Sequence, residues 1–281
     1  MVDLTGVNVL IRGAGGMGSG IAVRLMRSGI FRICMLEQTR PRSVQRLASF
    51  AEAVYEGVSA VEGVPAAMVS HPHELPDLWG SGCLGVLIDP MAHSVRALRP
   101  TVCIDATGER QGCFSLTDAP LVIGLRPAHQ PGVHAHVVIE TSGPRLGEVL
   151  YAPSPDLPSQ QEQADAITGN VFSLHAPGKG MFRTERNIGE QVKAGEIIGA
   201  LHTAVGAPRQ EILVPVSGTL RGILRDYTPV SEGNRLARID PREDVACHRI
   251  SDRVLAVGGG VLEAILATFH KRMQPPRGIL H

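Results

Sequence analysis

A glycine-rich loop near the start of the chain limits the folds that the chain can adopt. Residues 9–29 read VLIRGAGGMGSGIAVRLMRSG and carry the spacing G-x-G-x-x-G at Gly13, Gly15 and Gly18. The short β-branched stretch 7–12 predicts a buried parallel strand, and the apolar residues after the loop recur at helical spacing. A loop of this kind is typical of α/β folds in which a helix begins directly after the first strand.

Each glycine of the loop has a mechanical role in such a fold. Gly13 allows the sharp turn out of the strand, and Gly15 leaves room for a pyrophosphate to approach the backbone. Gly18 lets the helix pack closely on the sheet. Amides at the amino end of the helix, including that of Gly16, offer free N–H groups and partial positive charge to phosphates. We therefore expect a nucleotide site here, the alternative being a fold that has lost its ligand.

Glu37 supports a dinucleotide as the ligand. It ends the second predicted strand, 31–37, and lies 19 residues after Gly18. A carboxylate in that position accepts hydrogen bonds from ribose hydroxyls and disfavours a 2′-phosphate. The expected cofactor is therefore NAD or a related dinucleotide rather than NADP.

The alternation of strand and helix patterns predicts the fold class. We expect a Rossmann-like, doubly wound α/β sheet. A second helix is expected to begin at Pro41. Further strands are predicted at 85–89, 101–105, 120–125, 134–140 and 148–152.

Two aspartates end predicted strands on the side where open α/β sheets bind ligands. Asp89 follows one strand and Asp105 closes the next. They are candidate cofactor-binding residues. The alternative is that they cap the turns that follow.

An internal repeat follows a polar, proline-rich linker candidate at 153–168. APGKGMFRTERNIGEQVKAGEIIGAL (176–201) aligns with VPVSGTLRGILRDYTPVSEGNRLARI (214–239) at a constant offset of 38 residues. Two such copies predict an all-β barrel-sandwich domain that resembles biotinyl and lipoyl carrier domains. The stretch between the copies, HTAVGAPRQE, has no lysine to modify, which favours a structural or docking module.

The last apolar pattern, ISDRVLAVGGGVLEAILATFHKR, predicts a helix. Gly258–Gly260 are expected at or just before its start, where they could form a second anion nest or allow close backbone packing. The predicted domains are therefore 1–152 for the Rossmann-like part, 169–242 for the barrel sandwich, and 248–273 for a C-terminal helix on the first domain.

Composition excludes several classes of protein. There are 27 basic and 27 acidic residues and 4% aromatics, which disfavours a nucleic-acid or anionic-membrane surface. The five cysteines are scattered without a C-x-x-C pair, which argues against a disulfide framework and a structural zinc site. No apolar stretch reaches the roughly 20 residues of a membrane span and no signal peptide is visible, so we expect a cytoplasmic protein.

Catalytic chemistry is not assigned by the sequence. His134 and His136 would share one face of a strand and could bind a transition metal, but hydrogen-bonded histidines at a sheet edge are the alternative, and we assign no metal site. There is no G-x-S-x-G, no Walker A lysine and no H-E-x-x-H. Whether the protein is an enzyme stays open.

Several stretches taken together resemble a known family. VLIRGAGGMGSGIAVRL, FAEAVYEGVSAVEGV, GVHAHVVIET and, most specifically, ISDRVLAVGGGVLEAIL are similar to the selenium-dependent molybdenum hydroxylase maturation proteins. The chain departs from that family at Arg126-Pro127-Ala128-His129, where G-P-G-F is usual, and at His134, where an aspartate is usual. These departures imply a changed ligand or a sister role.

The resemblance implies a cytoplasmic accessory factor for a selenium-dependent molybdenum hydroxylase. Its partners would be the hydroxylase client or other maturation proteins, with homo-oligomers also open. The glycine loop would then hold NAD or a molybdopterin dinucleotide. Two alternatives come from other classes: an NAD-dependent oxidoreductase acting on a small substrate, and a scaffold without a small-molecule ligand.

Overall fold

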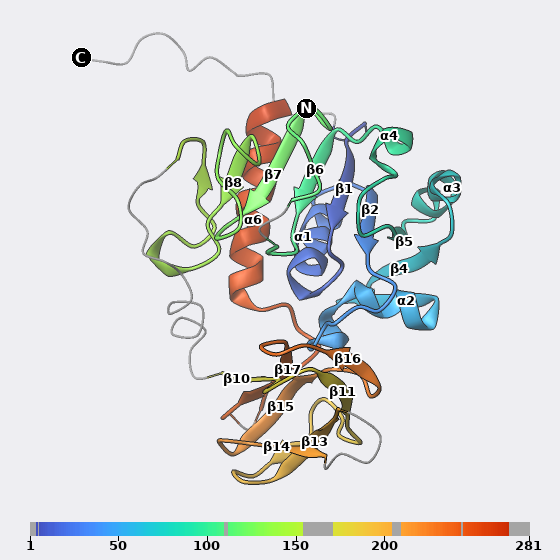
Figure 1. Ribbon diagram of the computed structural model, residues 1–281. Coiled ribbons are helices and arrows are strands. Elements are labelled where there is room, and N and C mark those ends of the chain that lie inside the picture. Colours follow the sequence, from blue (N-terminus) through green and yellow to red (C-terminus); the bar gives the residue numbers. More distant parts are fainter. Residues whose placement is uncertain are drawn as a thin grey trace, which may run out of the picture.

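The computed structural model describes residues 4, 6–109, 112–153, 171–203, 209–242 and 244–269. They form two parts, which Figure 1 shows one above the other. The sheet body comprises the described residues up to 153 together with the C-terminal helix, and it contains a nine-stranded sheet. The β module comprises residues 171–242 and contains two four-stranded sheets.

The elements have the following bounds. The strands of the sheet body are β1 (Asn8–Arg12), β2 (Arg32–Glu37), β3 (Val58–Val61), β4 (Val64–Val69), β5 (Leu84–Ile88), β6 (Val102–Asp105), β7 (Leu121–Leu125), β8 (Val137–Ile139) and β9 (Val149–Leu150). Its helices are α1 (Gly16–Arg27), α2 (Ala53–Glu56), α3 (Leu75–Gly80), α4 (Val95–Leu98) and α6 (Asp252–Phe269), with 3₁₀ turns η1 (Arg46–Ala48), η2 (Phe50–Glu52), η3 (Pro72–Glu74) and η4 (Gly143–Arg145). The strands of the β module are β10 (Phe172–His175), β11 (Gly180–Arg183), β12 (Gln191–Val192), β13 (Ile197–His202), β14 (Gln210–Leu213), β15 (Gly218–Ile223), β16 (Thr228–Val230) and β17 (Arg235–Asp240).

The large sheet is mixed. Its order is β3-β4-β5-β2-β1-β6-β7-β8-β9, with parallel pairing from β4 through β8. The edge strands β3 and β9 pair antiparallel with their neighbours. Consecutive strands spread to opposite sides of β1, so the order reverses between β1 and β6. Their carboxyl ends point toward the β module (Figure 1).

The predicted fold class is therefore wrong and is corrected to a mixed sheet with a separate antiparallel β module. Both edges of the sheet are antiparallel hairpins, so the sheet is mixed and not parallel throughout. No helix lies between β6 and β7 or between β7 and β8 in the part of the chain that the structure describes. Because these connections contain no helix, α6 from the C-terminal end of the sequence covers much of one face of the sheet at β7 and β8.

Helices cover both faces of the sheet. On one face α1 packs against α6 so closely that a Cβ on Gly20 would lie 2.1 Å from Cγ1 of Val254. On the other face the buried residues cluster with Leu75 of α3, and Leu98 of α4 packs against them. The apolar periodicity of α1 explains its burial, and Gly29, at φ +89°, lies just beyond the end of the helix.

The β module follows the 38-residue offset strand by strand. β11 begins at Gly180 and β15 at Gly218, β10 and β14 as well as β13 and β17 are also 38 residues apart, and β12 and β16 are 38 residues apart at their last residues. One sheet has the order β10-β17-β15-β12 and the other β14-β13-β11-β16, so each sheet takes two strands from each copy. Phe182 and Leu220, which occupy equivalent strands, are both fully buried in the shared core.

Local predictions differ from the structure in three places. The helix expected from Pro41 is divided into η1, η2 and α2, because Ser49 is extended and its side chain accepts a hydrogen bond from the Ala51 amide. The hairpin β3–β4 was not predicted, although Glu62 and Gly63 at its turn both have positive φ, as a two-residue hairpin requires. The strand predicted at 134–140 is limited to β8.

The C-terminal glycines pack rather than bind. Gly258–Gly260 lie inside α6, not before its start, which excludes the anion nest and agrees with the alternative of close backbone packing. A Cβ on Gly260 would lie 2.1 Å from the carbonyl oxygen of Gly147. The linker predicted at 153–168 falls almost wholly outside the described residues, so the domain limits stay a prediction. Among the described residues, no helix is both long and apolar enough to cross a bilayer.

Candidate functional site

The glycine loop lies between the carboxyl end of β1 and the amino end of α1. Gly13 has φ +94°, and a Cβ there would lie 3.1 Å from Cγ2 of Thr107. A Cβ on Gly18 would lie 1.9 Å from the carbonyl oxygen of Gly13, so this glycine is required by packing. At Gly15 a Cβ would meet no atom within 4 Å. The loop is therefore tight at its two ends and opens onto free space at its middle glycine.

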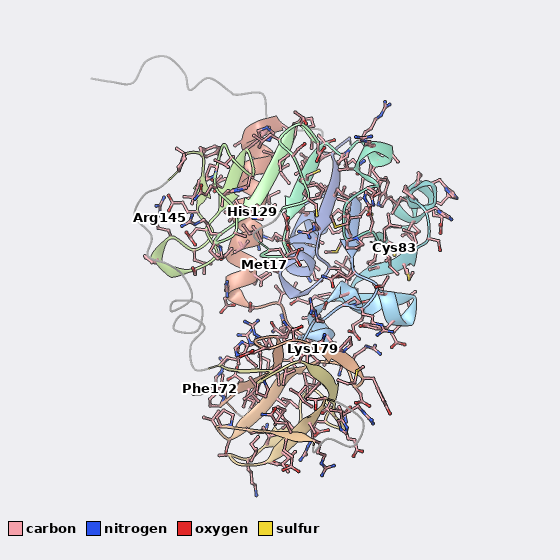
Figure 2. All side chains as sticks on the ribbon, viewed as in Figure 1. Met17, Cys83, His129, Arg145, Phe172 and Lys179 are labelled. Atoms are coloured by element: carbon pink, nitrogen blue, oxygen red, sulfur yellow. The ribbon has the colours of Figure 1, made fainter. Side chains whose placement is uncertain are left out.

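The amino end of α1 presents unpaired amides. Gly15 caps the helix without a side-chain hydrogen bond, and the first turn contains no acidic residue. Within the described part of the chain, the amides of Gly16 and Met17 have no acceptor. Unpaired N–H groups and the helix dipole together give this end a partial positive charge. Figure 2 labels Met17 in this first turn.

Glu37 holds the glycine loop in place. Its Oε2 accepts a hydrogen bond of 2.8 Å from the Ala14 amide, and its Oε1 accepts one of 2.8 Å from Gln38. Burial raises the pKa of Glu37, although these amide hydrogen bonds oppose the effect. Each carboxylate oxygen keeps a further lone pair. The role of Glu37 toward a ribose stays a prediction.

Arg12, which the sequence reasoning did not single out, organises the edge of the sheet beside the loop. It ends β1, is 7% exposed, and pairs in register with Asp105 of β6. Its Nη1 donates to Asp105 at 3.1 Å and to Thr107 at 3.0 Å, and its Nη2 donates to Glu109 at 2.5 Å. An arginine directly before G-x-G at the end of an apolar strand was the available signal.

The two predicted strand-end aspartates lie at this edge and both hold turns. Asp105 accepts hydrogen bonds from the amide and hydroxyl of Thr107. Asp89 accepts from the amides of His93 and Ser94 at 3.0 and 2.7 Å. Burial would raise the pKa of each aspartate, but the hydrogen bonds to each carboxylate outweigh it and the pKa is lowered. Capping thus occupies both carboxylates, and contact with a ligand stays a prediction.

His129 is a further buried titratable group of the site. It is 2% exposed and follows β7, where Figure 2 labels it. Its Nδ1 lies 3.1 Å from the carbonyl oxygen of Leu125, and its Nε2 lies 3.6 Å from Oδ2 of Asp105, longer than a hydrogen bond. Burial lowers the pKa of His129, but the Asp105 carboxylate and the Leu125 carbonyl raise it by a larger amount. The net shift of the pKa is therefore upward.

The other two histidines of this region accept hydrogen bonds from backbone amides. Nδ1 of His134 accepts from the Gln130 amide, and Nδ1 of His136 accepts from the Val122 amide. Both residues precede β8 instead of lying within it. Across the described residues, no group of three or more histidine, cysteine or acidic side chains is arranged to hold a metal ion.

Comparison with known proteins gives one curated relative and a set of distant structures. No protein-family model matches the chain. It is 33% identical to the uncharacterized protein YqeB of Escherichia coli K12 over 281 residues, which is 97% of this chain and 50% of that protein. The chain therefore spans about half the length of this relative.

The solved structures found are similar only at a low level. A succinylglutamate desuccinylase/aspartoacylase from Rhodobacter sphaeroides is 11% identical with a TM-score of 0.26, covering 84% of this chain and 86% of that one. An aspartoacylase family protein from Mesorhizobium loti is 14% identical with a TM-score of 0.26, with coverage of 84% and 86%.

These comparisons correct the predicted family. None of the proteins named above is described as a molybdenum hydroxylase maturation factor, and the structures are described as desuccinylases or aspartoacylases. The predicted role in selenium-dependent molybdenum hydroxylase maturation is therefore wrong. The alternative of an NAD-dependent oxidoreductase has no support in these comparisons either. Binding of a dinucleotide at the glycine loop stays a prediction.

Proposed function

We propose that the protein binds a dinucleotide, with the diphosphate at the amino end of α1. The observation that carries this proposal is the open space at Gly15, beside the unpaired amides of Gly16 and Met17. Backbone can approach a phosphate closely only where no side chain intervenes. Gly13 and Gly18 keep the loop in this shape through packing that tolerates no side chain at Gly18.

Two features favour the dinucleotide over a single phosphate. Glu37 lies at the end of β2, and its carboxylate already contacts the loop through Ala14. Its remaining lone pairs are available to a ribose hydroxyl, which supports NAD over NADP. The strand order also reverses between β1 and β6, and open sheets bind nucleotides at such a point. A molybdopterin dinucleotide shares this chemistry and is a second probe.

The proposal extends to the setting of the protein. All five cysteines are free thiols, which suits the reducing cytoplasm. Residues 171–242 would close the ligand site from the carboxyl side of the sheet.

Binding of NAD to the purified chain tests the proposal. In Gly15→Val, the new side chain fills the open space, and because Gly15 is extended, with φ −67°, the backbone accommodates valine. We expect calorimetry to detect NAD binding by the wild type and no NAD binding by G15V. The two proteins should have the same melting temperature without ligand. Gly178→Val, at another glycine with nothing within 4 Å, is the matched control and should bind normally. Equal NAD affinity of G15V and the wild type overturns the proposal.

A second measurement does not depend on the choice of ligand. Small molecules released on denaturing the purified wild type should include a dinucleotide in the mass spectrum, and G15V should release less of it. Release of equal amounts from both proteins would place that ligand away from the loop.

A further inference from the structure

Four arginines gather where the β module meets the sheet body. Arg221 comes from β15, Arg235 and Arg238 from β17, and Arg253 from the first turn of α6. Figure 2 shows side chains with nitrogen ends between the two parts of the molecule. Arg221, Arg235 and Arg238 share one sheet of the β module because β15 pairs with β17, and only Arg253 is contributed by the sheet body.

The guanidinium groups have few anionic partners. Arg221 donates to Asp240 at 3.3 Å, but Asp240 is shared with Arg242, which holds it by two hydrogen bonds of 2.8 and 2.6 Å. Across the described residues, no carboxylate oxygen lies within 4 Å of Arg235, Arg238 or Arg253. The cluster therefore carries more positive charge than its neighbours balance.

Two nitrogens in the cluster also lack hydrogen-bond partners. The Nε atoms of Arg221 and Arg238 are buried and donate to no group in the described part of the chain. A buried donor without an acceptor is unfavourable and is commonly satisfied by a ligand or water. Arg238 uses Nη1 to donate to Gln45 at 3.1 Å, and Arg253 donates from Nε to the carbonyl oxygen of Thr141 at 2.7 Å. The side chains are thus held in position around unsatisfied donors.

The positive charges of the cluster repel one another. Burial, followed by the charges of Arg235, Arg221 and Arg253, lowers the pKa of Arg238 to about 10, and the Asp240 carboxylate opposes this shift. Burial followed by the charge of Arg235 also lowers the pKa of Arg253. An anion between these groups would remove both the repulsion and the unsatisfied donors.

The cluster lies beside the glycine loop. Gln45, which accepts from Arg238, has its Oε1 3.8 Å from the position that a Cβ on Gly16 would take. The neighbouring residue Val44 packs against the β module. A Cβ on Gly222 of β15 would lie 2.6 Å from the carbonyl oxygen of Val44. One residue therefore separates Arg238 from the first turn of α1.

We propose that Arg221, Arg235, Arg238 and Arg253 form an oxyanion site for a phosphate group of the ligand that the glycine loop holds. The amides of α1 would contact the ligand from the sheet body. The arginines would contact it from the region where the β module meets the sheet body. Guanidinium forks suit phosphate oxygens because they donate two hydrogen bonds in one plane. In its choice of ligand this inference rests on the proposed dinucleotide binding. The anion site itself can be tested without it.

The test uses inorganic pyrophosphate and NAD on the full chain. Pyrophosphate should raise the melting temperature of the wild type above that in sodium chloride of equal ionic strength. Arg238→Gln should lose this rise and should melt no lower than the wild type without ligand, because repulsion is relieved. NAD should bind R238Q about tenfold or more weakly, the loss expected when a charged hydrogen bond is removed. Arg209→Gln, at an arginine in the β module whose side chain is 66% exposed, is the control and should match the wild type.

Arg235→Gln keeps the test valid if R238Q does not fold, since Arg235 is exposed and its replacement leaves the core untouched. It should reduce the pyrophosphate effect. A pyrophosphate effect that is absent in the wild type, or that is unchanged in both arginine variants, overturns the inference. If pyrophosphate acts through Arg238 but no dinucleotide binds, the proposed function fails while the anion site stands.

Discussion

Neighbouring glycines in α6 should respond oppositely to the same substitution. Gly259 and Gly260 both lie inside α6, where alanine is favoured over glycine by about 1 kcal/mol. A Cβ on Gly259 would meet only the end of the flexible Arg24 side chain, at 3.9 Å. Gly259→Ala should therefore stabilise the protein by about 1 kcal/mol, which raises the melting temperature by roughly 2–4 °C in a chain of this size.

Gly260→Ala meets backbone instead. Its Cβ would lie 2.1 Å from the carbonyl oxygen of Gly147 and 3.0 Å from Cγ2 of Ile139. Overpacking of this kind costs about 3 kcal/mol at the upper end of its usual range. After the helix gain of about 1 kcal/mol, a net loss of roughly 2 kcal/mol remains, which is a fall of about 4–8 °C.

Thermal unfolding followed by far-ultraviolet circular dichroism measures both variants against the wild type. The two substitutions add the same methyl group to adjacent positions of one helix, so propensity cancels in the comparison. A difference of roughly 3 kcal/mol between them reports the contact of α6 with the 143–147 turn. Melting temperatures that move in the same direction would refute the packing assigned to α6.

Two further predictions concern the site. Because the pKa of His129 is raised in the fold by Asp105 and the Leu125 carbonyl despite burial, its contribution to stability is present below about pH 6.5 and is lost as the pH rises through the folded value. The melting temperature of His129→Gln should therefore fall less than that of the wild type as the pH rises above about 6.5, with exposed His248→Gln as the control; parallel curves would contradict this. Glu37→Gln should weaken NAD binding about tenfold, since an amide offers one acceptor oxygen where the carboxylate offers two. An unchanged dissociation constant in calorimetry would exclude a contact between Glu37 and the ribose.

Local rules account for what could be predicted from the residues in order. The positive φ of Gly13 and the close approach at Gly18 follow from a strand, a tight turn and a helix in succession. The 38-residue repeat likewise predicts equivalent strands, because the same local pattern forms the same local structure. Strands such as β1, β2 and β6 lie within one residue or so of their predicted positions.

The pairing at the edges of the sheet and the side-chain partners in the site could be read only from the tertiary structure. The hairpins at β3 and β9 determine that the sheet is mixed, and hairpin pairing depends on which strands remain without neighbours. The pairing of Arg12 with Asp105 joins residues 93 positions apart, and nothing local to either residue specifies it. The family assignment failed for a related reason, since motif resemblance gives local pattern without the contacts that define a site.

The amino-acid sequence by itself determined the glycine loop, the helix that follows it and the two copies of the repeat. Each depends on backbone preferences and side-chain periodicity within a few residues. Only the tertiary structure decided that Glu37 holds the loop, that Gly260 packs against Gly147, and that Arg238 of the β module contacts Gln45 of the sheet body. Those contacts join segments far apart in the chain, and their free energy exists only once these segments have packed together.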